Sequence, residues 1–280
     1  MKICATISEA RAACRDARAG RKRLGLVPTM GALHEGHLSL VRAAKGCDAV
    51  AVSIFVNPTQ FGPTEDLSKY PRQFDRDRQL LEKEGIEILF APSVEEIYPN
   101  GAVTWVFVEG LSEKLDGRSR PGHFRGVTTI VAKLFNIIEP EAAFFGQKDA
   151  AQLAVIRRMV EDLNFPVEIV ACPIVRESDG LAMSSRNAYL NREERGCALV
   201  LRRSLEQVQR EFQAGERIAA KLISAAKEVF ASEPHVVLDY FEVVDPDTLD
   251  PVERISQRTL VAVAAHVGST RLIDNTVLYP

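Results

Sequence analysis

Two histidines lie three residues apart at the start of a helical pattern, directly after a short apolar run that ends near Pro28. On the first turn of a helix His34 and His37 would face the same ligand. Gly36 between them has no Cβ, so the backbone can approach that ligand closely. Two imidazoles beside a phosphate can donate hydrogen bonds and stabilise the charge that builds up on the α-phosphorus during nucleotidyl transfer. We favour this role over the alternative that each ring caps a helix or fills space.

Two further turns carry polar side chains that suit a nucleotide or a small acid. Gln60 lies in the turn 57–62, and its amide offers a donor and an acceptor to a hydroxylated substrate. An ordinary Asn-Pro turn with Gln60 in solvent has equal weight from these residues alone. In the turn 146–149, Lys148 can neutralise phosphate charge and Asp149 can accept from a ribose hydroxyl, while Gln152 would point into the same crevice. The alternative is that Lys148 and Asp149 are simply exposed, as such residues in loops usually are.

A fourth polar turn, 183–187, combines two serine hydroxyls with the guanidinium of Arg186. These are good donors for a polyphosphate, and a serine-rich turn that caps the next helix is the equally weighted alternative. The basic loop 118–126 could contact anions or form an interface, two readings of similar weight. Together the four turns favour a nucleotide site more strongly than any one of them does.

The elements that must position these turns alternate between buried strands and helices over roughly the first 170 residues. This order predicts an α/β fold, a doubly wound, Rossmann-like parallel sheet covered on both faces. Ligands bind beyond the carboxyl ends of such strands, which is where the polar turns lie. The expected strands are 24–28, 49–56, 87–90, 142–145 and 167–172, with 103–108 as an extra or edge strand, and the expected helices are 38–45, 72–83, 127–138 and 150–163.

The pattern changes near Val175. Two long amphipathic stretches are followed by strands without intervening helices, which indicates a smaller α+β domain. We therefore expect a nucleotide-binding domain at 1–174 and a smaller domain at 175–280 that acts as a lid. The stretches expected in the smaller domain are the helices 192–212 and 217–231 and the strands 238–244, 259–265 and 271–274.

Composition excludes several classes of protein. The 280 residues are 46% apolar and 26% charged, as in packed globular proteins, and the net charge of -3 gives no general attraction to nucleic acid or an anionic membrane. Five scattered cysteines without a C-x-x-C pair argue against a disulfide framework or a zinc site. With no signal peptide and no apolar run of membrane-spanning length, we expect a cytoplasmic protein. The sequence contains no G-x-G-x-x-G or Walker A motif, which argues against a dehydrogenase or a P-loop nucleotide-binding protein.

Taken together, these motifs resemble the HIGH-type nucleotidyltransferase superfamily, with Met183-Ser184-Ser185-Arg186 in the place of a Lys-Met-Ser-Lys-Ser loop. The segments 27–37, 52–62, 120–138, 145–153 and 183–190, in this order and spacing, resemble the pantothenate synthetase (pantoate–β-alanine ligase) family, and the likeness extends to 271–275. The resemblance implies that pantoate and β-alanine are condensed at the expense of ATP, with Mg2+, through a pantoyl-adenylate. It also implies release of AMP and pyrophosphate, and a homodimer.

The resemblance further implies roles for individual residues. His37 would be the proton donor, with His34, Lys148 and Arg186 as further catalytic residues, and Gln60 and Gln152 would hold pantoate. The metal ligands stay open, because the triphosphate itself supplies much of the coordination. The implied ATP-binding residues are Met30, Gly31, Ala32, Leu33, His34, Glu35, Gly36, His37, Gly146, Gln147, Lys148, Asp149, Val175, Met183, Ser184, Ser185 and Arg186.

The main alternative is another small-molecule adenylyltransferase or acyl-adenylate amide ligase of the same fold. Gln60 and Gln152 favour a small hydroxy acid over such substrates. A tRNA-charging enzyme is disfavoured because no basic or anticodon-binding extension is present. A non-catalytic nucleotide-binding regulator is disfavoured because both histidines, Lys148 and Arg186 are present. No base for the β-alanine amine is identified.

Overall fold

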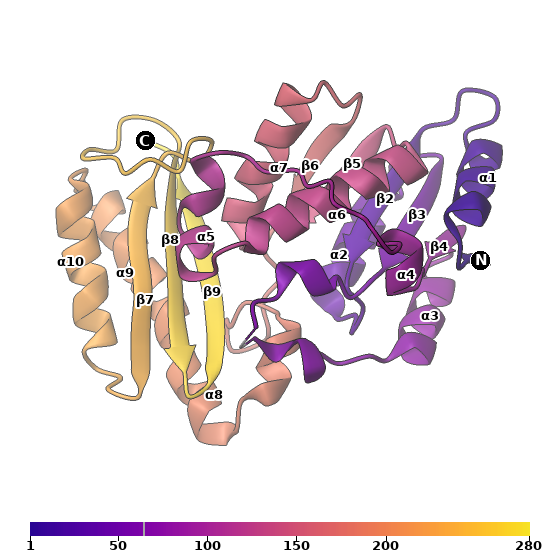
Figure 1. The fold of residues 1–280 in the computed structure, drawn as a ribbon. Helices are drawn as coiled ribbons and strands as arrows, with labels where there is room; N and C mark the ends of the chain where they lie inside the picture. Colours follow the sequence, from indigo (N-terminus) through magenta and orange to yellow (C-terminus); the bar gives the residue numbers. More distant parts are fainter. Residues whose placement is uncertain (64) are drawn as a thin grey trace. The chain divides into compact units, whose positions relative to one another are not determined.

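The computed structural model describes residues 1–63 and 65–280, which divide into two compact units (Figure 1). A six-stranded parallel sheet lies in the first unit and a three-stranded antiparallel sheet in the second. The expected α/β class, with a parallel Rossmann-like sheet and a smaller α+β part, is confirmed. The first unit comprises Met1–Glu113, Arg120–Gly146 and Val155–Cys172, and the second comprises Lys114–Ser119, Gln147–Ala154 and Pro173–Pro280.

The parallel sheet has a change of direction at its centre. From β2 the chain moves outward to β3 and β4, and it then returns to the other side of β2 to form β5. In open α/β sheets, ligands bind at such a switch point, beyond the carboxyl ends of the strands. The strand order is β1 (Lys2–Cys4), β4 (Ile88–Phe90), β3 (Ala49–Ile54), β2 (Leu24–Thr29), β5 (Ala142–Gly146) and β6 (Glu168–Cys172), with every neighbouring pair parallel.

Both faces of the parallel sheet are covered. Successive residues of a strand point to opposite faces, and Leu26 and Val27 of β2 are both fully buried. One face packs against helices α2 (Glu35–Ala44) and α3 (Phe74–Lys83) through a cluster that includes Val41 and Leu81. The remaining helices of this unit include α1 (Ile7–Ala17), α4 (Val94–Ile97), α6 (His123–Ile138) and the part of α7 (Ala150–Asp162) from Val155 onward, with short 3-10 turns at η1 (Pro58–Gln60), η2 (Asp66–Ser68) and η3 (Leu111–Glu113).

The second unit packs two helices on one face of its antiparallel sheet. Helices α9 (Val200–Gln213) and α10 (Ala219–Phe230) bury their apolar sides against this sheet. The sheet order is β7 (Val236–Val244), β8 (Thr259–Val267) and β9 (Thr270–Leu278). The unit also contains α5 (Asp116–Ser119), η4 (Gln147–Asp149), η5 (Ser185–Tyr189) and α8 (Arg192–Ala198).

The prediction of a strand at 103–108 is wrong. Residues 103–108 form no strand, because the backbone N–H of Val106 donates to the Thr129 hydroxyl at 3.0 Å and its carbonyl accepts from the Thr128 hydroxyl at 2.6 Å. These α6 side chains therefore take the place of a neighbouring strand. The structure also contains β1 and α1, which the sequence pattern did not predict.

The stretch expected as one helix at 192–212 is two helices, α8 and α9. They are separated at Leu199, whose N–H donates to the Gly196 carbonyl three residues back, so the chain tightens there before α9 begins. The last strand is longer than expected, since β9 spans nine residues rather than four. Its extra residues pair with β8 along the whole length of that strand.

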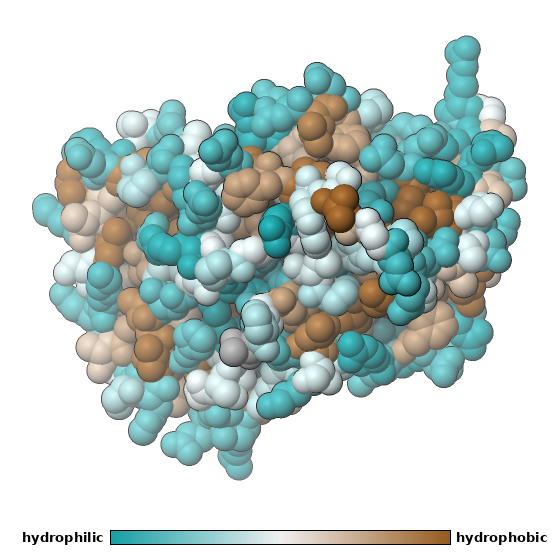
Figure 2. All heavy atoms as spheres, in the orientation of Figure 1, coloured by the Kyte–Doolittle hydropathy of each residue, from teal (hydrophilic) through white to brown (hydrophobic). Residues whose placement is uncertain are grey.

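Within the described ranges 1–63 and 65–280, no helix has the length and apolar character that crossing a membrane requires. Figure 2 shows hydrophilic and hydrophobic residues interspersed over the face in view. All five cysteines are free thiols, and three of them, Cys4, Cys14 and Cys172, are buried. Burial raises the pKa of the Cys14 thiol to about 12, so it stays protonated at neutral pH.

Replacement of Leu81 by alanine tests the packing of α3 on the parallel sheet. Leu81 is fully buried, so Leu81→Ala should lower the free energy of unfolding by about 2–5 kcal/mol through lost burial and a residual cavity. Leu163→Ala is the matched control, because that side chain is 52% exposed, and its effect should stay within about 0.5 kcal/mol. Urea denaturation followed by circular dichroism measures both, and equal losses would contradict this packing.

Candidate active site

The turn after β2 is held by a buried carboxylate from α3. Gly31 and Ala32 both have positive φ, at 81° and 51°. Such a conformation costs an alanine roughly 1–2 kcal/mol, so other contacts must hold it. Asp77, which is 1% exposed, accepts the backbone N–H groups of Ala32 at 2.7 Å and Leu33 at 2.8 Å. Burial raises the pKa of the Asp77 carboxyl, while these two N–H groups oppose the shift.

His34 and His37 form a reciprocal cap at the N-terminus of α2. The Nδ1 atom of His34 accepts from the Gly36 N–H at 3.1 Å, and Nδ1 of His37 accepts from the His34 N–H at 3.4 Å. An imidazole that accepts at Nδ1 carries its proton, when neutral, on Nε2. The ring centroids are 4.1 Å apart, so two Nε2–H donors stand side by side at the positive end of a helix. This arrangement suits a phosphate.

Gln60 is oriented by a network centred on Asn57. Asn57 is 1% exposed, and its Nδ2 donates to the side-chain oxygen of Gln60 and to the Gly126 carbonyl, both at 3.1 Å. The Nε2 of Gln60 then faces the Met30 sulfur at 3.0 Å, so two predicted site residues are brought together. A Cβ at Gly126 would lie 2.3 Å from the Thr59 carbonyl oxygen, so only glycine allows α6 this close to η1.

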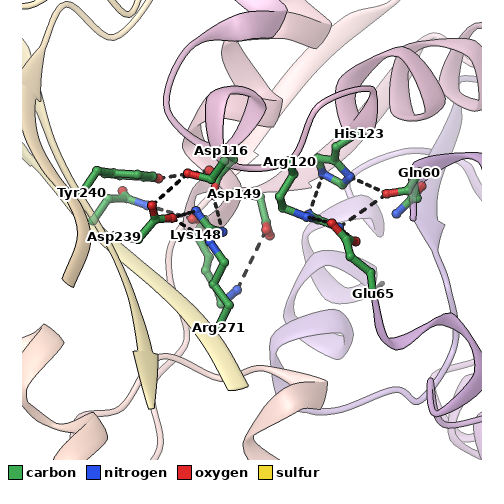
Figure 3. A network of polar contacts seen from close by, with 12 residues as sticks. Gln60, Glu65, Asp116, Arg120, His123, Lys148, Asp149, Asp239, Tyr240 and Arg271 are labelled. Carbon is green, nitrogen blue, oxygen red and sulfur yellow. Dashed lines mark hydrogen bonds and ion pairs between the residues drawn. The ribbon is translucent and has the colours of Figure 1, made fainter. Parts of the chain in front are cut away.

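The backbone of Gln60 is fixed by residues of the basic loop (Figure 3). His123 donates from Nδ1 to the Gln60 carbonyl at 2.8 Å, so its Nε2 can accept from Arg120 at 3.0 Å. Arg120 also forms an ion pair with Glu65 at 2.6 Å. Although burial favours the neutral acid, the Arg120 guanidinium keeps the pKa of the Glu65 carboxyl below its usual value. In this unit the basic loop therefore supports the Gln60 turn.

In the second unit, the turn that carries Lys148 is attached to β9. The amide of Asn275, 3% exposed, donates to the carbonyls of Gln147 and Lys148, each at 2.9 Å. Gln147 returns a hydrogen bond to Asn275 at 3.2 Å. The Lys148 amine lies 3.9 Å from the Asp149 carboxylate. Asn275 thus fixes the backbone of the turn that carries Lys148.

The Met183–Arg186 loop of the second unit begins from a short hairpin. The Met183 N–H donates to the Val175 carbonyl at 3.0 Å, which joins two predicted residues. Arg176 forms a two-pronged ion pair with Asp274 of β9, at 2.7 and 3.0 Å. Ser184 caps η5, with its hydroxyl accepting from the Arg186 N–H at 3.2 Å. Both η4 and η5 contact β9, so one strand holds the Lys148 turn and the Arg186 loop.

A buried ion-pair network holds α5 on the antiparallel sheet (Figure 3). Arg271 of β9 contacts Asp116 at 2.6 Å and Asp239 at 2.8 Å. The hydroxyl of Tyr240 donates to Asp116 at 3.1 Å. Burial, followed by the Asp116 charge, raises the pKa of Tyr240 well above its usual value, so the phenol stays neutral. This network explains why Lys114–Ser119 belongs to the second unit.

The predicted site residues divide into two sets, one in each unit. Ala32 and Leu33 are buried and donate their N–H groups to Asp77, and the Glu35 carboxylate forms an ion pair with Arg42. Gln152 lies at the start of α7. The first unit contains Met30, Gly31, Ala32, Leu33, His34, Glu35, Gly36, His37, Gln60 and Gly146, and the second contains Gln147, Lys148, Asp149, Gln152, Val175, Met183, Ser184, Ser185 and Arg186.

Three supporting residues were not predicted from the sequence: Asp77, Asn57 and Asn275. For Asp77 a signal was present, because an acidic residue four positions before the buried Leu81 occupies the inward face of the helix. Asn57 lies in the turn that drew attention to Gln60, but its burial does not follow from the turn pattern. Asn275 acts on residues about 127 positions away, and local sequence carries no sign of that contact.

Comparison with known proteins gives one consistent result. The pantoate–beta-alanine ligase family matches residues 2–277. Pantothenate synthetase of Acidobacterium capsulatum is 59% identical, covering 99% of this chain and 97% of the relative, and that of Thermotoga neapolitana is 57% identical, covering 99% and 100%. The crystal structure of pantothenate synthetase from Thermus thermophilus is 47% identical with a TM-score of 0.95, covering all of both chains.

A more distant solved structure belongs to the same group. Pantoate-beta-alanine ligase from Francisella tularensis, complexed with beta-gamma ATP and beta-alanine, is 32% identical with a TM-score of 0.76. It covers 99% of this chain, and 97% of its own length is matched. The parallel sheet, the histidine pair on α2 and these relatives agree: the chain belongs to the pantoate–β-alanine ligase family.

Proposed function

We propose that this chain condenses pantoate with β-alanine to give pantothenate, consuming ATP and releasing AMP and pyrophosphate through a pantoyl-adenylate. The observation that carries the proposal is the pair of imidazoles of His34 and His37 at the N-terminus of α2, each accepting a backbone N–H at Nδ1, next to the switch point of the sheet. Membership of the family supports the substrates. The relative from Francisella tularensis, complexed with beta-gamma ATP and beta-alanine, supports ATP and β-alanine as ligands.

In the first step a carboxylate oxygen of pantoate attacks the α-phosphorus of ATP, and pyrophosphate leaves. The pantoate carboxylate is ionised at neutral pH, so the step requires alignment and charge stabilisation rather than a general base. His34 and His37 supply hydrogen-bond donors, and the N-terminus of α2 supplies a positive dipole end. The further proposed donors to the phosphates are Lys148, Ser184, Ser185 and Arg186.

Gln60 and Gln152 are proposed to hold pantoate. The contact with Asn57 orients the Gln60 carboxamide before any substrate arrives, which lowers the entropy lost on binding. In the second step the neutral amine of β-alanine attacks the acyl carbon of the adenylate, AMP leaves, and the amine gives up a proton. A lid role for residues 175–280 would keep water away from the adenylate.

Mg2+ is proposed to enter as part of the substrate MgATP. Within residues 1–63 and 65–280, no group of three or more His, Cys, Asp and Glu side chains is arranged to hold a metal ion. Mg2+ usually keeps several waters and takes most of its protein-site ligands from substrate phosphates. Binding through the triphosphate therefore fits this chain better than a dedicated protein site.

A homodimer in the cytoplasm is also proposed. The extended segment 103–107 exposes Val103, Trp105 and Phe107, by 81%, 43% and 47%. Val106 faces α6 through both of its backbone groups, and residues 103–105 and 107 make no backbone hydrogen bond to the rest of the described chain. A second copy could pair with this edge and cover its apolar side chains. The free thiols fit a reducing compartment.

Replacement of His37 by alanine tests the adenylation role. His37→Ala should lower the rate of pantoate-dependent pyrophosphate release on the order of 100-fold or more, because a transition-state donor is lost, while the affinity for pantoate changes little. His266, exposed on β8, provides the control variant His266→Ala. If the His37→Ala variant releases pyrophosphate at the parent rate, the proposed adenylation role of His37 is wrong.

Isotope exchange tests the adenylate intermediate and the identity of the acid. With pantoate, MgATP and labelled pyrophosphate but no β-alanine, label should enter ATP, because the first step is reversible and complete without the amine. Omission of pantoate should abolish exchange. Absence of exchange when pantoate is present and β-alanine is withheld would contradict the two-step order, and exchange with another carboxylic acid in place of pantoate would favour a different acyl-adenylate ligase.

The double variant Trp105→Asp, Phe107→Asp tests the dimer. Two carboxylates on the exposed edge should prevent pairing, so light scattering should give the 30.9 kDa mass of one chain instead of the dimer mass. Val237→Asp is the control, because Val237 is an apolar residue 65% exposed on a different strand. A dimer that survives the double variant would show that another surface forms the interface.

A further inference from the structure

Asp77 is a buried carboxylate to which the proposed chemistry assigns no role. It lies on the first turns of α3 and is 1% exposed, whereas Asp75 and Arg76 beside it are exposed. Its two oxygens accept the N–H groups of Ala32 and Leu33, at 2.7 and 2.8 Å. These residues lie 45 and 44 positions earlier in the sequence and immediately precede His34.

The turn 31–33 depends on this carboxylate for its shape. The positive φ angles of Gly31 and Ala32 turn two consecutive N–H groups toward Asp77. A Cβ on Gly31 would lie 3.1 Å from the Asp77 carboxylate oxygen and 3.1 Å from the Ile54 side chain, so the fit is close on both sides. Ala32 and Leu33 are buried, and buried N–H groups without an acceptor are costly.

The same helix also fixes the peptide unit that reaches His37. Arg76 donates from Nη1 to the Leu33 carbonyl at 3.0 Å. That carbonyl belongs to the peptide unit whose N–H is that of His34, and in a planar trans peptide the two groups point in opposite directions. The His34 N–H in turn donates to Nδ1 of His37, which sets the tautomer of that ring.

We propose that Asp77 is a positioning residue for adenylation: its carboxylate holds the turn 31–33 so that the His34 N–H meets Nδ1 of His37 and both rings present Nε2–H to the nucleotide. Asp77 itself touches no reacting atom. The proposal rests on the proposed function of the histidine pair. It assigns to α3 a catalytic contribution that acts only through backbone geometry.

The variant Asp77→Asn tests this role with almost no change in volume. Its NH2 group replaces one acceptor and faces a backbone N–H, so one of the two contacts is lost. The rate constant kcat for pantoate-dependent pyrophosphate release should fall on the order of 10-fold to 100-fold through misplacement of the rings. The KM for pantoate should change by less than about twofold, since Gln60 has its own support.

A spectroscopic measurement separates positioning from a general loss of stability. The chain has five histidines, and their ring 15N signals report the tautomer of each. In Asp77→Asn the signals of His34 and His37 should shift, while those of His123, His235 and His266 stay in place. The control Glu82→Gln neutralises an exposed carboxylate on the same helix and should leave all five signals and kcat unchanged.

The outcomes distinguish this proposal from the proposed function. Unchanged His34 and His37 signals with parent kcat in Asp77→Asn would overturn the positioning role. If Asp77→Asn does not fold, Gly31→Ala decides, because its added Cβ presses on the same carboxylate, and unshifted histidine signals there would overturn the role as well. A parent enzyme that makes no pantothenate would refute the proposed function, and the histidine signals would still decide the role of Asp77.

Discussion

A negative charge inside the first unit is tolerated because two consecutive backbone N–H groups face it. Asp77 is nearly inaccessible to solvent, and burial raises the pKa of its carboxyl, with the N–H groups of Leu33 and Ala32 only partly offsetting the shift. A carboxyl whose pKa is higher in the folded state lowers the free energy of unfolding as the pH rises through that pKa. The fold therefore gives up stability at neutral pH at this position. In return, the left-handed turn before the histidine pair has a fixed shape.

The same kind of support recurs at each functional turn. Asn57 holds the amide of Gln60, and Asn275 holds the backbone of Lys148. Asn57 lies earlier in the same turn as Gln60, whereas Asn275 lies on β9, far from Lys148 in the sequence. In both cases a buried amide supplies hydrogen bonds to a polar residue that follows a strand. Groups that must bind a charged ligand gain little from packing, so their geometry depends on such hydrogen bonds. The residues proposed to bind ligands are therefore distinct from the residues that support them.

The central strands of the sheet could be predicted from the sequence because they are almost entirely buried. Residues 24–29 and 49–54 read as apolar runs with no exposed face, whereas β1 has only three residues and two of them are exposed. The segment 103–108 has the composition of a strand, but its hydrogen-bond partners are hydroxyls of α6, which composition does not reveal. The type of a secondary-structure element follows from the local sequence pattern, whereas its hydrogen-bond partners depend on distant residues.

Residues of the candidate site, too, could be predicted where their contacts are local and could not where their contacts are distant in sequence. His34 and His37 could be found from spacing alone, because their relation is local to one helical turn. The spacing of Asp77 from Leu81 indicates an inward-facing position, but its partners could not be predicted because they lie more than 40 residues away in the sequence. The contacts of Asn275 span about 127 residues. The sequence therefore indicated candidate functional groups, and the structure showed which residues fix their positions.

Asp274 and Asn275 are neighbours on β9, yet they secure different loops. Successive strand residues point to opposite faces, so Asp274 reaches Arg176 on one side while Asn275 reaches Gln147 and Lys148 on the other. A slip of one position against β8 would exchange the two faces and detach both loops at once. If Lys148 and Arg186 have their proposed roles, a misaligned hairpin would yield an inactive protein, and turnover in a preparation would count only molecules whose last strand pairs in register.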